Sequence, residues 1–173
     1  RAAEAFLNAV KARLETFILK LYEDKTRVID FSKTSYEVFD FLGFTFYRGR
    51  MRKSRGRLVM VKTSKTKLFK AVGEFTDWIK KERSAKRTED LMRIANAKLR
   101  GHYNYFGYWC NRNHLQRYYT EALKALFKWL NRRSQKKSLS PERFKLAIMS
   151  RLIQPPEVIN LKQLGWNPYA NIA

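Results

Sequence analysis

The sequence has a single cysteine, Cys110, among its 173 residues. One cysteine excludes a disulfide framework within the chain and favours a reducing compartment. No run of eighteen apolar residues occurs, so we expect no membrane-spanning helix and no membrane partner. The first residues mix acids into an amphipathic pattern and lack the basic start and small-residue cleavage site of a secretory signal. These absences predict an intracellular protein, either cytoplasmic or organellar.

Catalytic motifs are missing as well. The sequence contains no CxxC pair, no P-loop and no nucleophile elbow. Two-metal phosphoryl transfer needs carboxylates that converge on ions about 3.5–4 Å apart, whereas Glu23-Asp24 and Glu89-Asp90 lie at helix or turn boundaries, where capping explains them. His102, Cys110 and His114 fall short of the four ligands of a structural zinc site, so we expect them to be packing residues. The sequence predicts no catalytic centre, metal site or cofactor in this chain.

Acidic residues are scarce: there are 15 Asp+Glu against 37 Lys+Arg, for a net charge of +22. Residues 1–46 contain seven of each sign, and residues 47–173 carry the whole excess. Residues 48–67 alone hold nine basic residues and no acid. Like charges at this density repel one another unless a polyanion neutralises them. Because 45% of the residues are hydrophobic, the chain should fold, and its predicted partner is a nucleic acid, RNA or DNA.

The neutral part predicts a helix over residues 2–21, a strand over 27–31 and a strand over 38–46. Gly43 lies inside the last run, where a glycine indicates a bulge or a close approach. In the basic stretch 47–62, alternating arginines, a Gly56 turn and a β-branched return strand predict a hairpin.

Three apolar helical patterns follow, over residues 68–79, 91–106 and 115–130, and they predict a small bundle. A fourth helix is predicted over residues 140–152, with Ser140 as N-cap and Pro141 at its first position. Gly101 stands inside the second pattern, beside Arg100. A glycine there suits close approach by a neighbouring helix or by an RNA backbone, and both alternatives stay open.

Several segments resemble group II intron reverse transcriptase/maturases, in the same order and over nearly the whole chain. They are EDKT (23–26), FDFLGF (39–44), the basic hairpin, LMRIANAKLRGHYNYFGYW (91–109) and KWLNRR (128–133). The most specific, LRGHYNYF, is similar to the L-R-G-W-x-N-Y-F signature of the family's maturase-specific domain, also called domain X or the thumb. His102 and Tyr103 depart from that signature. FLG (41–43) resembles the last conserved palm block of reverse transcriptases.

The resemblance implies an α+β fold: the C-terminal end of a reverse-transcriptase palm, with a helix, antiparallel strands and a basic β-hairpin, followed by a helical-bundle thumb. It divides the chain into the end of the palm with a primer-grip-like strand (1–46), the basic hairpin (47–67), a three-helix thumb (68–133) and a C-terminal helix and tail (134–173). The family's Tyr-x-Asp-Asp motif, which binds the catalytic metal ions, is absent. The resemblance therefore implies that the fingers, the catalytic palm and its Mg²⁺ belong to other parts of a longer polymerase, and that this segment alone is inactive.

The implied function is that of an RNA-directed DNA polymerase and maturase, whose thumb clamps template–primer duplex and intron RNA for reverse transcription and for intron splicing or mobility. The primer-grip-like residues would be Phe41, Leu42, Gly43 and Phe44. The expected RNA-binding residues are Lys25, Arg48, Arg50, Arg52, Lys53, Arg55, Arg57, Lys62, Lys65, Arg100, Gly101, Tyr105, Arg117, Lys124, Lys128, Arg132 and Arg133.

The sequence also indicates aromatic side chains that could contact RNA, and it leaves alternative functions open. Tyr105, Tyr108 and Trp109 lie off the main apolar stripe, so they are the rings best suited to stack on bases. One alternative function is that of a stand-alone basic helical RNA-binding protein or RNA chaperone without polymerase activity. An integrase-like DNA-binding fragment is disfavoured by the absence of an acidic triad.

Overall fold

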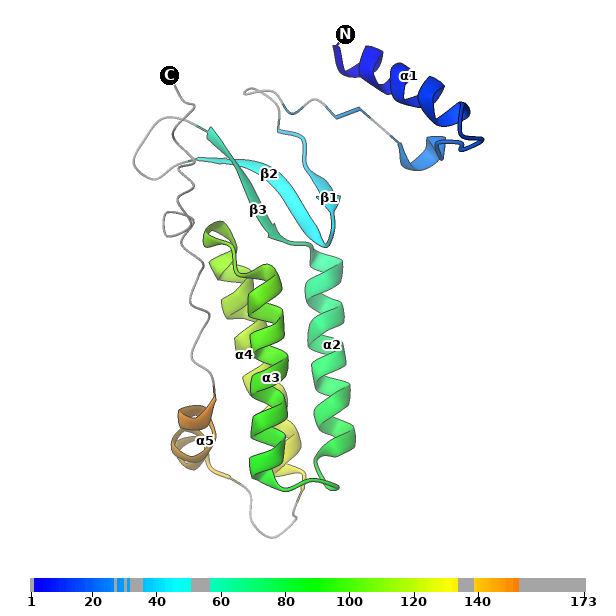
Figure 1. Ribbon diagram of the computed structural model, residues 1–173. Coiled ribbons are helices and arrows are strands. Elements are labelled where there is room, and N and C mark those ends of the chain that lie inside the picture. Colours follow the sequence, from blue (N-terminus) through cyan, green and yellow to red (C-terminus); the bar gives the residue numbers. More distant parts are fainter. Residues whose placement is uncertain are drawn as a thin grey trace. The chain divides into compact units, whose positions relative to one another are not determined.

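The computed structural model describes residues 2–26, 28–29, 31, 36–50, 57–133 and 139–152. This part combines five α-helices with one three-stranded antiparallel sheet, an arrangement compatible with the expected α+β class (Figure 1). Within these residues no helix is long and apolar enough to cross a membrane. The chain divides into two compact units, one of residues 1–38 with 48–58 and one of residues 39–47 with 59–173.

The first unit contains helix α1 (Ala2–Glu15), which confirms the first part of the helix predicted over residues 2–21 but ends at Glu15. None of its residues is buried, and Phe6 is 71% exposed. The strand predicted over residues 27–31 is wrong at its described positions, Val28, Ile29 and Phe31, which are not in a strand. The Phe31 carbonyl instead accepts hydrogen bonds from Arg48 Nε (3.0 Å) and Nη2 (2.7 Å), so a side chain satisfies the acceptor that a ladder would use.

The sheet has the order β1–β2–β3, with β1 at Phe39–Phe41, β2 at Phe44–Arg50 and β3 at Arg57–Thr63. Strands β1 and β2 are antiparallel, with Phe39 opposite Phe46 and Phe41 opposite Phe44. Strands β2 and β3 are neighbours, as the predicted basic hairpin requires. Its tip, with Arg52, Lys53 and Arg55, lies outside the described residues.

Gly43 lies in a turn, so the prediction of one continuous strand over residues 38–46 is wrong. Leu42 (φ +49°) and Gly43 (φ +82°) are both left-handed and link β1 to β2. Two consecutive residues of positive φ match the right-handed twist of the flanking strands, and glycine adopts that backbone without steric cost. The expected close approach of another backbone is present too, because the Ser64 N–H donates to the Gly43 carbonyl at 2.9 Å; a Cβ at Gly43 would also lie 3.2 Å from Lys67 Cγ.

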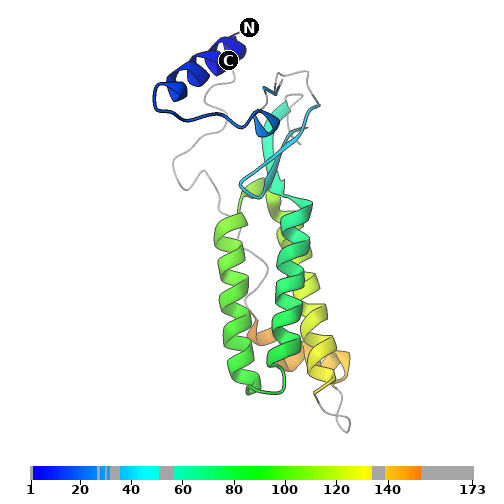
Figure 2. The same ribbon diagram turned by 90° about the vertical axis from the view of Figure 1, so that its right-hand side faces the viewer.

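The three expected long helices are present: α2 (Lys65–Glu82), α3 (Thr88–Phe106) and α4 (Arg112–Asn131). They run side by side in both ribbon views (Figures 1 and 2). Helix α2 begins before the predicted position because Ser64 caps it, accepting a hydrogen bond from the Lys67 N–H. Helix α5 (Pro141–Ala147) is capped by Ser140 as predicted, but it ends early and a 3-10 turn (Met149–Arg151) follows.

The core of the second unit forms where the apolar faces of these helices meet. Its completely buried side chains include Phe75 and Ile79 of α2, Leu91 and Leu99 of α3, and Leu115 and Leu126 of α4. Tyr103 and Phe106 are also buried, which confirms that the apolar stripe of α3 continues past Gly101. The amphipathic patterns therefore place the three helices correctly.

A buried polar junction fastens β3 to the helices. Between α3 and α4, a 3-10 turn (Trp109–Asn111) carries Asn111, which is completely buried. Its Oδ1 accepts from the Thr63 N–H, and its Nδ2 donates to Thr63 Oγ1 and to the Phe106 carbonyl, each at 2.8 Å. Cys110 Sγ adds contacts to the backbone of Val61 at 3.1 and 3.2 Å. The junction thereby sets the position of the sheet end on the bundle.

Candidate nucleic-acid interface

A groove lies between α2 and α3, next to the β1–β2 turn. Its larger hollow has a volume of about 520 Å³ and adjoins a second one of about 230 Å³, with Ala71, Glu74 and His102 lining both. The remaining lining residues are Leu42, Gly43, Lys67, Lys70, Tyr105 and Phe106 in the first hollow, and Phe75, Lys98, Gly101 and Tyr118 in the second. All of them belong to the second unit.

Helical periodicity builds the two walls. Lys67, Lys70, Ala71 and Glu74 occupy positions i, i+3, i+4 and i+7 of α2. On α3, Lys98, Gly101, His102 and Tyr105 have the same spacing. Residues so spaced lie on one face of a helix. The groove is therefore formed by two matching helix faces, one row of residues on each.

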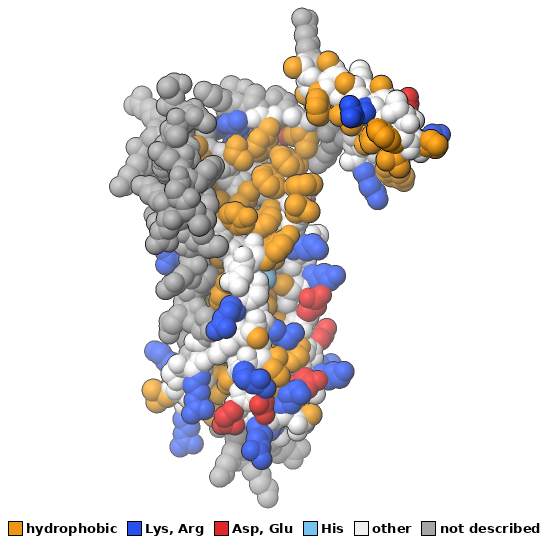
Figure 3. Space-filling model, viewed as in Figure 1, with side chains coloured by type: hydrophobic (Ala, Val, Ile, Leu, Met, Phe, Trp, Pro, Cys, Tyr) orange, Lys and Arg blue, Asp and Glu red, His pale blue; other side chains and the backbone are white. Residues whose placement is uncertain are grey.

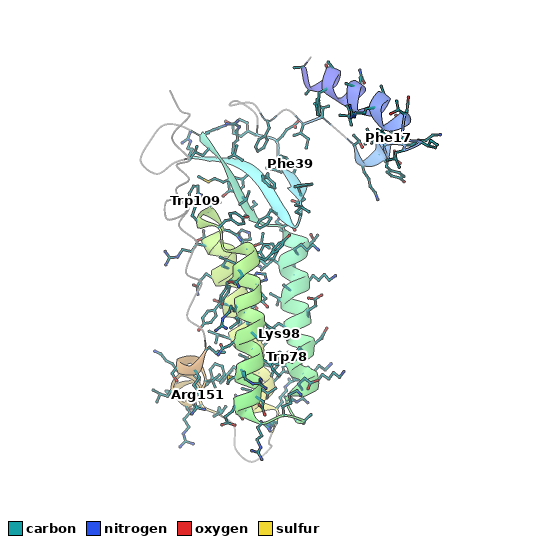
Figure 4. All side chains as sticks on the ribbon, in the orientation of Figure 1. Phe17, Phe39, Trp78, Lys98, Trp109 and Arg151 are labelled. Atoms are coloured by element: carbon teal, nitrogen blue, oxygen red, sulfur yellow. The ribbon has the colours of Figure 1, made fainter. Side chains whose placement is uncertain are left out.

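Three lysines and one carboxylate give the groove a net positive charge. Lys70 Nζ lies 3.9 Å from Glu74 Oε1 in an exposed ion pair, and pairs of this kind contribute little stability. Lys98 Nζ lies 5.4 Å from the centre of the Trp78 ring, and Figure 4 shows the two side chains next to each other between α3 and α2. The stem of Lys67 packs against Gly43. The groove suits a chain of anionic groups better than a neutral ligand.

The inner wall of the groove is aromatic and uncharged at neutral pH. The His102 ring stacks on Tyr118 with centroids 3.8 Å apart. Burial lowers the pKa of His102 to about 4. Burial and the nearby Glu74 carboxylate raise the pKa of Tyr118 to about 12. Both groups are therefore neutral at pH 7, so the charges of the groove come from its lysines and Glu74.

Exposed apolar side chains gather at the turn end of the groove, seen as the orange area over β1 and the neighbouring end of α3 in Figure 3. Phe41, Leu42, Tyr105 and Tyr108 are all exposed. Tyr105 donates its hydroxyl hydrogen to the Leu42 carbonyl at 3.0 Å and so holds the turn against α3. Exposed rings beside lysines can stack on bases, a contact of about 1–3 kcal/mol each.

The four residues of the primer-grip-like segment differ in their exposure to solvent. Phe41 and Leu42 are exposed, and Gly43 shapes the turn. Phe44 is buried, with its ring centroid 5.0–5.8 Å from those of Tyr105, Phe106 and Tyr108. Phe44 therefore anchors the turn by packing against these three rings, while the exposed side chains of Phe41 and Leu42 are available to contact a ligand. Trp109 is half-buried.

In the first unit, two of the candidate arginines already have partners. Arg48 is bound to the Phe31 carbonyl. Arg57 Nη2 bonds with the Tyr36 hydroxyl at 2.6 Å, and this bond lowers the pKa of Tyr36. Lys25 lies 5.0 Å from the Tyr22 ring, and Arg50 is exposed.

The remaining candidates are spread over several surfaces of the second unit. Lys65, Arg100 and Gly101 are exposed, and Lys62 lies 5.1 Å from the Tyr47 ring. The candidates on α4 and its C-cap have different partners: Arg117 lies over Phe69, Lys124 pairs with Glu121 at 2.9 Å, and Lys128 and Arg132 lie over Trp129. Arg133 bonds to the Lys86 carbonyl at 2.7 Å and to Thr88 Oγ1 at 3.2 Å. The structure therefore does not gather all the candidates into one site.

The groove contains only two of the expected RNA-binding residues, Gly101 and Tyr105, together with Leu42 and Gly43 of the expected primer grip. Sequence reasoning missed Lys67, Lys70 and Lys98. The i, i+3, i+4, i+7 spacing of these lysines with their neighbours could have indicated a shared helix face, but a search for apolar periodicity does not detect it. Within the described residues no three His, Cys, Asp or Glu side chains are grouped as metal ligands.

Comparison with protein families relates this region to a known domain. Residues 69–146 match the family model of the group II intron maturase-specific domain. Comparison with curated proteins and with solved structures gave no match. The matched span begins in α2 after Lys67, ends in α5 and includes the whole of α3. It implies a function related to intron maturation and splicing. Residues 69–146 are therefore similar to the group II intron maturase-specific domain.

Proposed function

We propose that the domain binds RNA along the α2–α3 groove, as the thumb and palm end of a group II intron-type reverse transcriptase and maturase. The observation that carries the proposal is the pairing of lysines on both groove walls with exposed rings at the turn end, next to and partly within the span that matches the maturase-specific domain. Lysines neutralise phosphates and rings stack on unpaired bases. One continuous surface thus offers both kinds of contact.

The charge distribution suits recognition of backbone rather than of sequence. An A-form duplex is recognised mainly by its shape, phosphates and 2′-hydroxyls. Lys67, Lys70 and Lys98 are point charges on flexible stems and are suited to phosphates in more than one register. Gly101 leaves open space between them, since a Cβ there would have no neighbour within 4 Å. We infer that intron RNA and template–primer duplex can occupy the same groove.

In this proposal Phe41 and Leu42 contact the primer end, and catalysis takes place in another part of the polymerase, where carboxylates hold Mg²⁺. The surface of α1 would contact the rest of the palm and fingers. Support for that contact comes from the exposed side chains of Phe6 in α1 and of Phe17 in the turn after it, which are costly to leave in water. The neutral charge of residues 1–46 also suits a protein partner better than RNA.

The alternative is a stand-alone RNA-binding protein or RNA chaperone. It would use the same groove, so RNA binding alone does not separate the two functions. The DNA upstream of the Arg1 codon separates them. An in-frame Tyr-x-Asp-Asp block supports the polymerase, whereas a start codon just before Arg1 supports the stand-alone protein.

The salt dependence of RNA binding tests the proposal. For this chain and a fluorescent RNA duplex, log K should fall linearly with log salt concentration, with a slope of about −0.9 for each phosphate neutralised, the value for duplex DNA. The chain should bind but should not extend a primer. An affinity that stays flat from low to high salt would exclude phosphate binding, and primer extension would contradict the placement of the carboxylates outside this segment.

A further inference from the structure

A second basic cluster surrounds Trp129, where α2 and α4 end. Four cations lie within 6 Å of the centre of its ring: Arg83 at 4.6 Å, Arg132 at 5.1 Å, Lys128 at 5.4 Å and Lys80 at 5.7 Å. Two of them belong to α2 and its C-cap, and two to α4 and its C-cap. All these distances are within the range of a cation–π contact. One half-buried indole thus collects four positive charges.

Carboxylates do not balance this cluster. Within the described ranges, ion pairs to acids are made by other cations, such as Lys86 with Glu82 and Arg151 with Glu89. The nearby Arg133 is held by the α2–α3 connection. Trp129 Nε1 and Arg83 Nε are buried donors without a partner among the described residues. The cluster therefore has more donors and positive charge than the surrounding protein satisfies.

Helix dipoles account for part of this charge but not for its arrangement. The C-termini of α2 and α4 favour cations. Lys80 and Arg83 are three residues apart, however, and Lys128 and Arg132 are four apart, and like charges at these spacings destabilise a helix. The two like-charged pairs also meet across the same ring. A bound anion would relieve both repulsions.

We propose that the cluster around Trp129 is a second phosphate-binding site, which holds an RNA segment apart from the turn end of the groove. Lys67 and Lys80 are thirteen residues apart on α2, so the two sites are separated by about 20 Å along the helix. A strand rising 3.4 Å per nucleotide covers that distance in about six nucleotides. The inference depends on RNA binding by the domain but concerns different residues.

The test compares two variants of the full chain that lose equal charge. The first replaces Lys80, Arg83, Lys128 and Arg132 with glutamine. The control replaces Arg13, Lys20, Arg143 and Lys145, which are exposed and lie outside both sites. RNA affinity is measured as a function of salt, and thermal melting is followed in the absence of RNA.

We expect the cluster variant to bind RNA at least tenfold more weakly than the control variant at 0.1 M salt. Its log–log slope should be shallower by about 0.9 for each lost phosphate contact. Its melting temperature should be equal to or above that of the unmodified chain, because like-charge repulsion is removed. Equal RNA affinities of the two variants would overturn the second site. A lowered melting temperature with unchanged RNA affinity would also overturn it, because the four cations would then only stabilise the fold around Trp129.

The outcome also separates this inference from the proposed function. If the unmodified chain binds RNA with a steep salt dependence and the two variants behave alike, the second site alone is wrong. If the unmodified chain shows no salt-dependent RNA binding, both proposals fail.

Discussion

Replacement of Asn111 by alanine should destabilise the second unit more than any surface change. The side chain makes three hydrogen bonds, to the N–H and hydroxyl of Thr63 and to the Phe106 carbonyl. Asn111 and Thr63 are completely buried, so water does not replace these bonds. A buried polar group left unpaired costs about 1–3 kcal/mol. With three groups affected, we expect a loss of about 3 kcal/mol or more, a large part of the 5–15 kcal/mol typical of a domain.

Urea unfolding followed by circular dichroism measures this loss. Asn113→Ala is the matched control, because Asn113 is an exposed asparagine two residues further along; its effect should stay within about 0.5 kcal/mol. Thr63→Val removes only the hydroxyl partner and should cost about 1 kcal/mol. A loss below 1 kcal/mol for Asn111→Ala would refute the view that this junction fastens β3 to the bundle.

Three further predictions concern the turn, the groove and its histidine. Gly43→Ala should cost about 1–2 kcal/mol of unfolding free energy, since its φ is +82° and the new Cβ would meet Lys67; unchanged urea unfolding would contradict the turn geometry. Gly101→Ala should raise stability by about 1 kcal/mol, because the helical position is exposed and open, while Gly101→Leu should keep the fold and weaken RNA binding; a destabilised Gly101→Leu chain would instead indicate packing. The folded pKa of His102, about 4, is below the unfolded value of about 6.5, so the unfolded state binds more protons between these values and stability should fall as pH drops from 6.5 toward 4. His102→Phe should reduce that fall, and an identical pH profile of the two proteins would show that His102 is not buried in its neutral form.

The helices were predictable because their apolar residues repeat over many turns. Leu91, Leu99 and Phe106 reveal the buried side of α3 directly, and all three are in the core. Ser140 and Pro141 likewise mark the start of α5, since capping depends on residues close in sequence. Local chemistry was sufficient wherever local contacts decide the structure.

The turn and the 27–31 segment were not predictable in the same way. Residues 38–46 are apolar and aromatic enough for one strand, yet Leu42 and Gly43 turn the chain so that Phe39 stacks on Phe46 at 5.0 Å. The segment 27–31 has strand-forming residues, but the Phe31 carbonyl accepts a hydrogen bond from the Arg48 side chain, 17 residues further along the chain. Pairing between distant residues decides both segments, and strand propensity depends on such context.

The candidate site was predicted only in part for a similar reason. Net charge and the LRGHYNYF segment pointed to RNA binding and to the family, and residues 69–146 match its model. The groove, however, needs two helices to meet, and no single stretch of sequence contains both walls. Lys67 and Lys98 lie 31 positions apart and become opposite walls only in the folded bundle. The buried Asn111 was missed because an isolated asparagine in a loop gives no periodic signal.

RNA affinity after removal of the groove lysines is the most direct test of the account. The variant Lys67→Gln, Lys70→Gln, Lys98→Gln is compared with Arg13→Gln, Lys20→Gln, Arg143→Gln, which loses the same charge at exposed positions outside the groove. Groove binding predicts at least a tenfold loss of affinity for an RNA duplex at 0.1 M salt and a slope shallower by about 2 to 3, since each phosphate contact contributes about 0.9. Equal affinities and slopes for the two variants would contradict the central claim that RNA lies between α2 and α3.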